Sequence, residues 1–268
     1  MSNYQQITEE LTLLTQSVAN YIASQALSFS SDKIEHKGLN DLVSYVDKTA
    51  EMQLVKGLQQ ILPEAGFITE ENTISQETKD FQWIVDPLDG TTNFMHSLPC
   101  YSISVALMYQ NELVVGVVHE VNRNECFYAW KNGGAFLNGK AITVSNKPTL
   151  QDSLIATGFP YTVFEEIDDY LQLLKELMKC SHGLRRLGSA AVDLAYVACG
   201  RFESYFEYNL NAWDVAAGCL IVKEAGGQVT DFGGGRDFIF GRQVVATNRL
   251  IHQELMEVVG EHWDSSAQ

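Results

Sequence analysis

The stretch Val85–Phe94, VDPLDGTTNF, crowds two acids, a proline, a glycine and two adjacent threonines together directly after an apolar run. If the preceding strand ends at Asp86 and the chain turns at Pro87, the turn brings Asp86 and Asp89 together at the edge of a sheet. Such a cluster of oxygen ligands suits Mg²⁺, which demands octahedral oxygen geometry. An ordinary turn with aspartate capping fits the same residues, so the local pattern leaves both a turn and a metal site open.

Three more acids occur where predicted elements begin or end. Glu70 and Glu71 follow the apolar segment GFIT, and Asp214 opens the segment WDVAAG, where a lone carboxylate is more often a favourable first-turn charge than a ligand. Together with Asp86 and Asp89 these acids would repel one another, whereas with two or three divalent cations they would form a catalytic centre. Adjacent strand residues point to opposite faces, so we expect Glu70 rather than Glu71 to be a ligand.

The remainder of the chain predicts helices and strands in alternation. Helical spacing of apolar residues predicts an opening helix around Leu11–Ile22 and a second over 48–62, with Asp47 as a candidate N-cap. Strand patterns dominate from Gly66 to Trp130. Beyond them we expect strands in SLIATGF, RFESYFEY, QVTDF and QVVATN, and helices near 164–178, in GSAAVDLAYVACG, in WDVAAGCLIVKEAGG and from about Arg249. With no repeat or linker, this order predicts an α/β protein in which residues 1–268 form a single domain.

Composition narrows the function classes. The five cysteines are odd in number and scattered, which is typical of reduced thiols. A formal net charge of -16 argues against non-specific nucleic-acid binding, because phosphate backbones are held by clustered Lys and Arg. Without a signal-peptide pattern or a run of about 18 apolar residues, we expect a cytoplasmic protein with no membrane or nucleic-acid partner. The absence of G-x-S-x-G and P-loop motifs leaves serine-hydrolase and nucleotide-kinase chemistry without support.

Three blocks, FITEEN, WIVDPLDGTTNF and NAWDVAAGCLIVKEAGG, carry a family resemblance. Their order and approximate spacing resemble those of the inositol monophosphatase family of Mg²⁺-dependent, lithium-sensitive phosphatases. The resemblance extends from about Asp41 to Asn248. It implies an αβαβα layered sandwich of two sheets with helices between and outside them, assembled as a homodimer.

The resemblance implies roles for individual residues. The implied metal ligands, for two or three Mg²⁺ ions, are Glu70, Asp86, the backbone carbonyl of Leu88, Asp89 and Asp214. The implied catalytic residues are Asp47, Thr91 and Glu70. Asp86 would bridge two ions, and Asp214 would also contact the substrate. The backbone amides of Gly90 and Thr91 would bind the phosphate, and the Thr91 hydroxyl together with Asp47 would orient the attacking water.

Two further segments are implied to contact the rest of the substrate. Gly188, Ser189 and Ala190 open a predicted helix, and this run of small residues would also suit close helix packing. By resemblance these residues lie beside the substrate ring. Glu207 matches an acid that receives sugar hydroxyls, although a solvated acid at a strand end fits the same pattern. Lys37, in EHKGLNDLVSYVD, has no unambiguous register with the family lysine, so its role stays open.

The resemblance therefore predicts a phosphomonoesterase that hydrolyses myo-inositol monophosphate or a related polyol or sugar phosphate. Two metal ions can clamp the attacking and leaving oxygens of an in-line phosphoryl transfer, so a polarised water suffices as nucleophile. Alternatives of the same fold are fructose-1,6-bisphosphatases, 3'-phosphoadenosine 5'-phosphate phosphatases and histidinol-phosphate phosphatases. A different class of alternative is a regulatory protein that acts through protein contacts.

Overall fold

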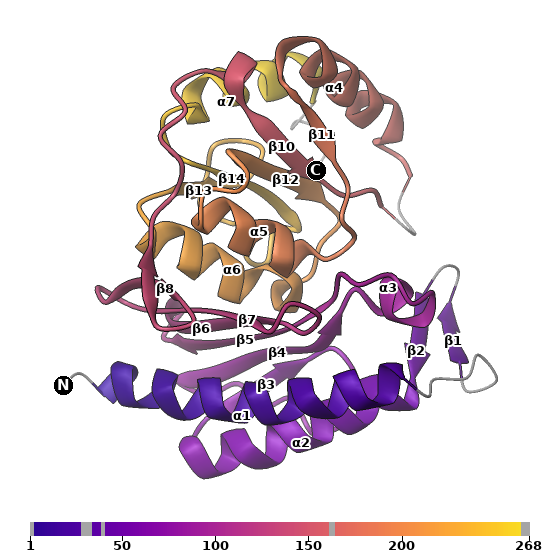
Figure 1. The fold of residues 1–268 in the computed structure, drawn as a ribbon, viewed down its shortest axis with the longest axis vertical. Helices are drawn as coiled ribbons and strands as arrows, with labels where there is room; N and C mark the ends of the chain where they lie inside the picture. The colour runs from indigo at the N-terminus through magenta and orange to yellow at the C-terminus, as the bar shows by residue number, and fades with distance from the viewer. Residues whose placement is uncertain (1–2, 28–33, 39–40, 161–163, 264–268) are drawn as a thin grey trace.

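Helices and two β-sheets alternate in five layers in the computed structural model, which describes residues 3–27, 34–38, 41–160 and 164–263 (Figure 1). The helices of these residues are α1 (Asn3–Ala26), α2 (Tyr45–Ile61), α3 (Thr91–Met95), α4 (Ile167–Cys180), α5 (Ala190–Ala198), α6 (Ala212–Glu224) and α7 (His252–His262). One outer layer contains α1 and α2, the central layer contains α5 and α6, and the other outer layer contains α4 and α7 (Figure 1). The predicted αβαβα sandwich is confirmed.

Two sheets and a separate hairpin contain the described strands. These strands are β1 (Ile34–Gly38), β2 (Asp41–Ser44), β3 (Gly66–Thr69), β4 (Phe81–Asp89), β5 (Ser102–Tyr109), β6 (Glu112–Glu120), β7 (Glu125–Trp130), β8 (Gly134–Leu137), β9 (Lys140–Ile142), β10 (Leu154–Thr157), β11 (Gly183–Arg185), β12 (Ser204–Tyr208), β13 (Gln228–Thr230) and β14 (Gln243–Thr247). The larger sheet has the order β3-β4-β5-β6-β7-β8-β9, with only the β3–β4 pair parallel. The smaller sheet has the order β11-β10-β12-β14-β13, with β10 parallel to both neighbours, and β1 pairs with β2.

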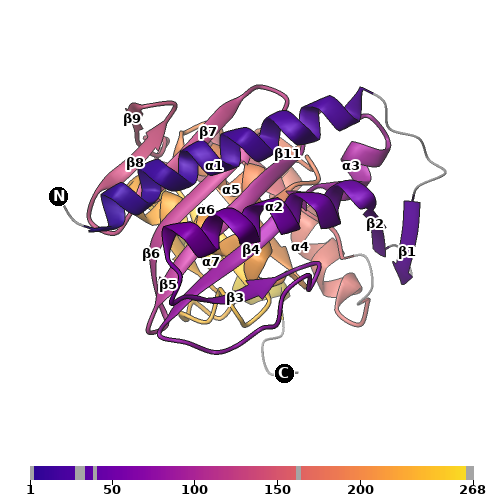
Figure 2. The ribbon, with the colours of Figure 1, turned by 90° about the horizontal axis from the view of Figure 1, so that it is seen from below.

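The outer helices α1 and α2 cross one face of the larger sheet side by side (Figure 2). Leu11 and Ile22 of α1 and Leu54 and Leu58 of α2 are fully buried, and they belong to the same apolar cluster as Trp83 of β4. Burial of one such side chain stabilises the fold by about 1.5–3 kcal/mol. This packing fixes α2 against β4, the strand that carries the acidic block.

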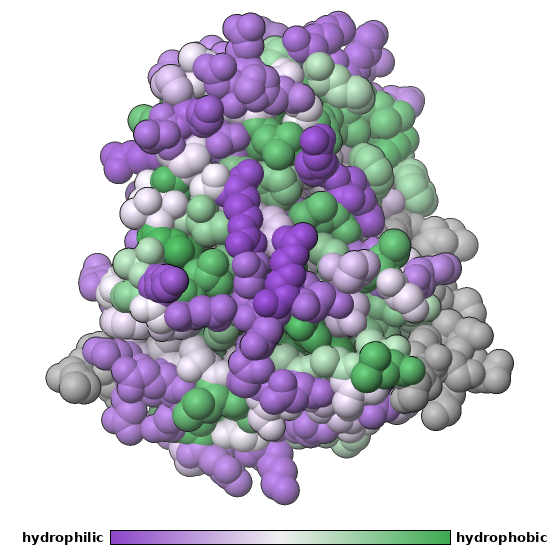
Figure 3. All heavy atoms as spheres, in the orientation of Figure 1, coloured by the Kyte–Doolittle hydropathy of each residue, from purple (hydrophilic) through white to green (hydrophobic). Residues whose placement is uncertain are grey.

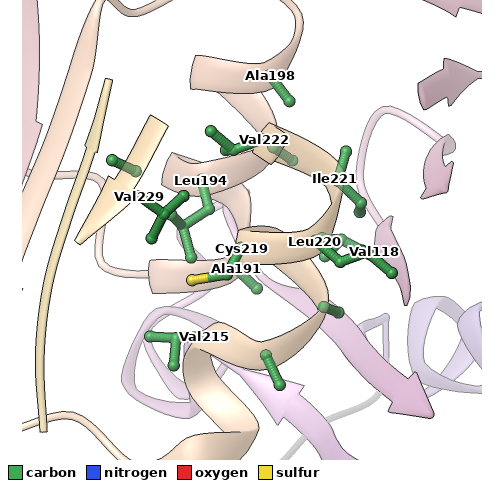
Figure 4. Packing of buried hydrophobic residues seen from close by; sticks show 14 of the residues in the cluster. Val118, Ala191, Leu194, Ala198, Val215, Cys219, Leu220, Ile221, Val222 and Val229 are labelled. Carbon is green, nitrogen blue, oxygen red and sulfur yellow. The ribbon is translucent and has the colours of Figure 1, made fainter. Parts of the chain in front are cut away.

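The central helices α5 and α6 fill the space between the two sheets, where Leu194 of α5 and Cys219 of α6 share one core (Figure 4). A Cβ atom at Gly218 of α6 would lie 2.5 Å from the Cβ atom of Leu194, so the two helices approach each other too closely for any other residue at this position. Every residue of α5 is buried. The close contact holds the two helices together, and the beginnings of both line one cavity, described below.

The second helix begins at Tyr45, and the prediction that Asp47 is its N-cap is wrong. Ser44 is the N-cap, and its hydroxyl accepts a hydrogen bond from the Val46 amide over 3.1 Å. Asp47 reaches back to accept a hydrogen bond from the Ser44 amide over 2.9 Å, which completes a capping box. Tyr45 and Val46 are modest helix formers, so the sequence pattern places the start too late.

The β1–β2 hairpin, the strand β11 and the helix α3 are short features that lie outside the predicted elements. None of these elements is longer than the 5 residues of β1 and α3. The strands IEHKG, DLVS and GLR show no clear alternation of apolar and polar residues, so their pairing partners decide their conformation.

None of the helices in the described part of the chain is long and apolar enough to span a membrane. Hydrophilic side chains cover much of the face seen in Figure 3, and apolar side chains lie among them in small groups. In α4, for example, Leu173 and Leu177 are buried whereas Asp168 and Asp169 are exposed. The outer helices therefore bury one face and leave the other polar.

Candidate active site

A cavity of about 470 Å³ lies where the end of β4 and the beginnings of α3, α5 and α6 meet. This volume suits a small ligand. Asp47 does not line the cavity, but it accepts a hydrogen bond from Thr91, which does. Glu71 does not line the cavity either. The Lys37 side chain lies outside the described residues. The predicted site residues that line the cavity are Glu70, Asp86, Leu88, Asp89, Gly90, Thr91, Gly188, Ser189, Ala190, Glu207 and Asp214.

Strand β4 continues through Asp89, so the expectation of a turn at Pro87 is wrong. Asp86 pairs opposite Ser104 of β5 and Asp89 pairs opposite Ser102, which leaves one extra residue in β4 between the two pairs. Residues three apart point to opposite faces of a regular strand, but the extra residue of a β-bulge puts both acids on the same face. Proline suits this position because it has no amide hydrogen to donate to the ladder.

Glu70 lies beside Asp86, at the end of the neighbouring strand. The Glu70 amide donates to the Val85 carbonyl over 3.3 Å, which extends the β3–β4 pairing by one residue. Burial raises the pKa of the Asp86 carboxyl group, and the charge of Glu70 raises it further. The next amide, that of Glu71, donates to Glu51 of α2 over 2.7 Å, and Glu71 does not line the cavity, although Asn72 does.

Asp89 is held by the beginning of α5. Ser189 is the N-cap of this helix, and its hydroxyl donates to Asp89 Oδ2 over 2.6 Å, while the Ala191 amide donates to the same oxygen over 2.7 Å. Asp89 is exposed only in part, on the cavity wall, and loss of hydration there raises its pKa to about 6 even though these hydrogen bonds lower it. The hydrogen of the Ser189 hydroxyl is therefore donated to Asp89 and is not available to a ligand in the cavity.

The remaining two acids also sit in poorly hydrated surroundings. Asp214 lies in the first turn of α6, where its Oδ2 accepts a hydrogen bond from the Asn211 amide over 2.6 Å. Loss of hydration, followed by the charge of Asp89, raises the pKa of Asp214 to about 7. Asp86 is only 2% exposed, and burial together with the carboxylates of Glu70, Asp89 and Asp214 raises its pKa well above the usual range. Carboxylates crowded in this way favour a cation between them.

The donor set fits Mg²⁺ by its chemistry, because it consists of carboxylate oxygens and the Leu88 carbonyl. Among the described residues, no three acidic, histidine or cysteine side chains already converge as a metal-binding group. One oxygen each of Asp86 and Asp89 is occupied, by the Leu88 amide and by α5 respectively. A cation would therefore use the other oxygen of each carboxylate or share the oxygen that already accepts a hydrogen bond.

Thr91 connects this acidic group to α2. Its Oγ1 lies 2.9 Å from Asp47 Oδ1 and 2.9 Å from the Leu88 carbonyl oxygen. A hydroxyl has one hydrogen, so it can donate fully to only one of these acceptors while its lone pairs remain available. Asp47 is 1% exposed and is fixed by Ser44, which makes it a rigid acceptor.

Gly90 separates Asp89 from α3 and has a φ angle of +97°. A Cβ atom at this position would lie 3.0 Å from the Cys100 carbonyl oxygen and 3.2 Å from that of Gly188. Both the backbone conformation and the lack of space require glycine. The backbone of Gly90 can therefore border the cavity without an intervening side chain.

Glu207 forms the opposite wall of the cavity. The Tyr205 hydroxyl donates to Glu207 Oε2 over 2.6 Å, and the carboxyl group packs so close to Gly158 that a Cβ atom there would lie 1.8 Å from Oε2. Loss of hydration raises the pKa of Glu207 to about 8, against the opposing effects of Tyr205 and Arg186. Glu207 is thus recessed in the cavity wall and is not a solvated acid.

A model of the inositol monophosphatase family matches residues 3–264. The chain belongs to the inositol monophosphatase family. It is 40% identical over 228 residues to the inositol-1-monophosphatase of Mesorhizobium japonicum, covering 85% of this chain and 86% of the relative. It is 41% identical over 231 residues to a putative Nus factor SuhB of Neisseria meningitidis serogroup B, covering 86% of this chain and 88% of the relative. The solved structure of a Thermotoga maritima IMPase matches with a TM-score of 0.85 and 36% identity, covering 93% of this chain and 95% of that one.

Several cavity residues of this inositol monophosphatase family member escape prediction from the sequence. Arg186 lowers the pKa of both Asp89 and Glu207, and Arg242 lowers that of Asp214, so two arginines offset the acids. Asp193 of α5 also lines the cavity. A lone acid in the apolar segment AAVDLAYVA is a signal that could have revealed Asp193, since charged residues are rarely buried without a reason. No local pattern marks Arg242.

We expect the metal-free form of this inositol monophosphatase family member to lose stability as the pH rises from 5 to 8. The pKa values of Asp89, Asp214 and Glu207 are raised to about 6, 7 and 8 in the folded state, from 3.8, 3.8 and 4.5. Between the ordinary and the raised values the folded state binds protons that the unfolded state has released, so this stability is present at low pH and is lost as pH rises. Thermal unfolding in EDTA should show Tm falling by about 5 °C or more.

The same experiment on Glu207→Gln, which cannot ionise, should give a shallower decline of Tm with pH. Asp169→Asn is the matched control, because Asp169 is an exposed acid of α4 and its loss should leave the slope unchanged. A Tm that stays level or rises between pH 5 and 8 contradicts the raised pKa values.

Proposed function

We propose that this chain is a Mg²⁺-dependent phosphomonoesterase that hydrolyses myo-inositol monophosphate or a related polyol or sugar phosphate. The observation that carries the proposal is the bulge in β4, which puts Asp86 and Asp89 on one face beside Glu70, with Thr91 two residues after Asp89. Family membership supports the same chemistry.

Five groups of this chain would hold two or three Mg²⁺ ions, namely Glu70, Asp86, the Leu88 carbonyl, Asp89 and Asp214. When bound, the metal supplies a polarised water and neutralises charge on the transferring phosphoryl group. Coordination through the Leu88 carbonyl would leave Asp47 as the acceptor for the Thr91 hydrogen. The lone pairs of the Thr91 hydroxyl would then accept a hydrogen bond from the attacking water and orient it.

The chain's backbone and the far wall of the cavity would hold the rest of the substrate. The amides of Gly90 and Thr91 would bind the phosphate, since both residues line the cavity. Gly188 and Ala190 would lie against the polyol ring. Ser189 would contribute through its backbone, because its hydroxyl is donated to Asp89.

A panel of phosphate esters assayed with and without Mg²⁺ tests this proposal. The panel contains myo-inositol 1-phosphate, fructose 1,6-bisphosphate, 3'-phosphoadenosine 5'-phosphate and histidinol phosphate. We expect the highest kcat/KM with the inositol ester and no turnover in excess EDTA. Preference for another ester would reassign the substrate, and full turnover in EDTA would refute the metal-dependent mechanism.

Glu207 should distinguish recognition of the substrate hydroxyls from phosphate chemistry. A hydrogen bond to a charged group contributes about 1.5–3 kcal/mol, so Glu207→Ala should lower kcat/KM for the inositol ester by roughly 10- to 150-fold. Hydrolysis of p-nitrophenyl phosphate, which offers no hydroxyl, should be nearly unchanged. Glu207→Gln keeps an acceptor oxygen and should have a smaller effect.

Two outcomes would contradict this role for Glu207. Equal losses with the two substrates would place Glu207 in the metal or folding network. No loss with either substrate would leave the recognition of polyol hydroxyls to other residues of the cavity.

A second candidate function is regulation through protein contacts, and it is favoured by the relative named a putative Nus factor SuhB. Asp89→Asn discriminates between the two functions, because we expect it to remove hydrolysis and leave the outer surface unchanged. A cellular function that survives this substitution would depend on contacts rather than on catalysis. The homodimer, the cytoplasmic location, the lack of a nucleic-acid partner and the single domain over 1–268 stay predictions.

A further inference from the structure

A second buried acid, Glu51, lies on α2 one helical turn after Asp47. Both side chains belong to the buried face of the helix, and Glu51 is completely inaccessible to solvent. Residues four apart on a helix lie on the same side, about 6 Å from each other along the axis. Asp47 contacts Thr91 from this face, so Glu51 lies one helical turn away from a contact that belongs to the candidate site.

Glu51 binds the segment that directly follows Glu70. Its Oε2 accepts a hydrogen bond from the Glu71 amide over 2.7 Å. Its Oε1 accepts two hydrogen bonds from Thr73, one from the amide and one from the hydroxyl, each over 2.8 Å. Both carboxylate oxygens are thus occupied by hydrogen-bond donors of a single turn.

The turn needs this support because its backbone is irregular. Asn72 adopts a φ angle of +53°, and its side-chain amide donates back to the Glu70 carbonyl over 3.1 Å. The strand β3 has ended at Thr69, so the pairing of Glu70 with Val85 is the last backbone contact to the sheet. Beyond that contact, the turn is held by its bonds to Glu51 and by the Gln76 side-chain amide, which donates to the Thr69 carbonyl over 3.0 Å and to the Asn72 side chain.

We infer that Glu51 is a positioning residue that aims Glu70 at the cavity by fixing the turn 71–73. This inference rests on the proposed function, in which Glu70 is a metal ligand. One helix then places both halves of the site: Asp47 orients the Thr91 hydroxyl, and Glu51, one turn later, sets Glu70 beside Asp86. The same contact accounts for the choice between two adjacent glutamates, because the Glu71 amide is drawn toward α2 and away from the cavity.

Binding of Mn²⁺ to the substrate-free protein, followed by electron paramagnetic resonance of the free ion, tests the inference. In Glu51→Gln the new amide group faces hydrogen-bond donors of the turn, so the turn should loosen. We expect the dissociation constant for Mn²⁺ to rise about 10- to 100-fold, as is usual when a group that supports a metal ligand is lost. Glu51→Asp keeps the charge but retracts the carboxylate, and it should give a smaller shift in the same direction. The matched control is Glu64→Gln, at an exposed glutamate just after α2, which should bind Mn²⁺ as the unmodified chain does.

A double-mutant cycle separates positioning from a merely structural role. If Glu51 acts through Glu70, then Glu51→Gln should raise the Mn²⁺ dissociation constant in the unmodified chain but change it less than twofold in a Glu70→Gln background. Equal effects in both backgrounds, or unchanged Mn²⁺ affinity in Glu51→Gln and Glu51→Asp, would overturn the inference. Failure of the unmodified chain itself to bind Mn²⁺ or hydrolyse any phosphate ester would instead overturn the proposed function.

Discussion

Asp89→Asn is expected to lower kcat/KM for hydrolysis by about 10³-fold while leaving the protein folded. Asparagine has the same shape, and its carbonyl oxygen can keep the hydrogen bonds from Ser189 and Ala191. The amide NH₂ group would then point into the cavity, where it would repel a cation. Loss of about 4 kcal/mol of stabilisation by the metal corresponds to a roughly 10³-fold lower kcat/KM. Mg²⁺-dependent hydrolysis of myo-inositol 1-phosphate gives the measurement.

Stability should move in the opposite direction. Asp89 is one of several carboxylates that raise one another's pKa, so its replacement removes repulsion from the metal-free protein. We expect the Tm of Asp89→Asn in EDTA at pH 8 to equal or exceed that of the unmodified chain. Asp169→Asn, an exposed substitution, controls for the change of residue type and should leave activity intact. Activity within threefold of normal in Asp89→Asn would exclude Asp89 as a ligand.

Thr91→Ala and Asp47→Asn should each lower kcat by about 10²- to 10⁴-fold with little change in KM. The reason is that the Thr91 hydroxyl, fixed by Asp47 over 2.9 Å, would contact the attacking water and not the bound ester. An interaction made mainly in the transition state affects kcat more than KM. Steady-state kinetics with myo-inositol 1-phosphate at saturating Mg²⁺ distinguishes the two parameters.

The two variants should differ in stability. Asp47 accepts hydrogen bonds from Ser44 through Oδ2 and from Thr91 through Oδ1, and the single side-chain oxygen of asparagine can keep only one of these contacts. Asp47→Asn should therefore lower stability by about 1 kcal/mol, whereas Thr91→Ala leaves the capping box of α2 in place. Thr91→Ser keeps the hydroxyl and serves as the control with near-normal kcat. An effect confined to KM would mean that Thr91 and Asp47 bind the substrate instead of orienting the water.

Much of the secondary structure follows from local patterns. The periods of 2 and 3.6 are properties of short segments, which is why β4 to β7 and the helices α1 and α6 fall on predicted segments. The hairpin β1–β2 and the strand β11 depend on pairing partners and leave no such pattern. The residues alone predicted only mixed α/β structure, and the two-sheet layering came from the family resemblance.

By itself the sequence determined which residue types are available for chemistry and where they occur along the chain. The block Val85–Phe94, Glu70 and Asp214 could be singled out because acids next to turn residues and strand ends are visible locally. The family resemblance then joined these separate blocks into one site.

Only the tertiary structure decided how those residues meet. A one-residue bulge paired against β5 turns Asp86 and Asp89 to the same face, and the contact of the Glu71 amide with Glu51 leaves Glu70 at the cavity. The tertiary structure also brings Arg242 close to Asp214 and lets the Ser189 hydroxyl donate to Asp89. It removes the water that would otherwise keep the pKa values of Asp89 and Asp214 low. The direction and hydration of a side chain depend on neighbours far away in the chain, and a local pattern carries no information about them.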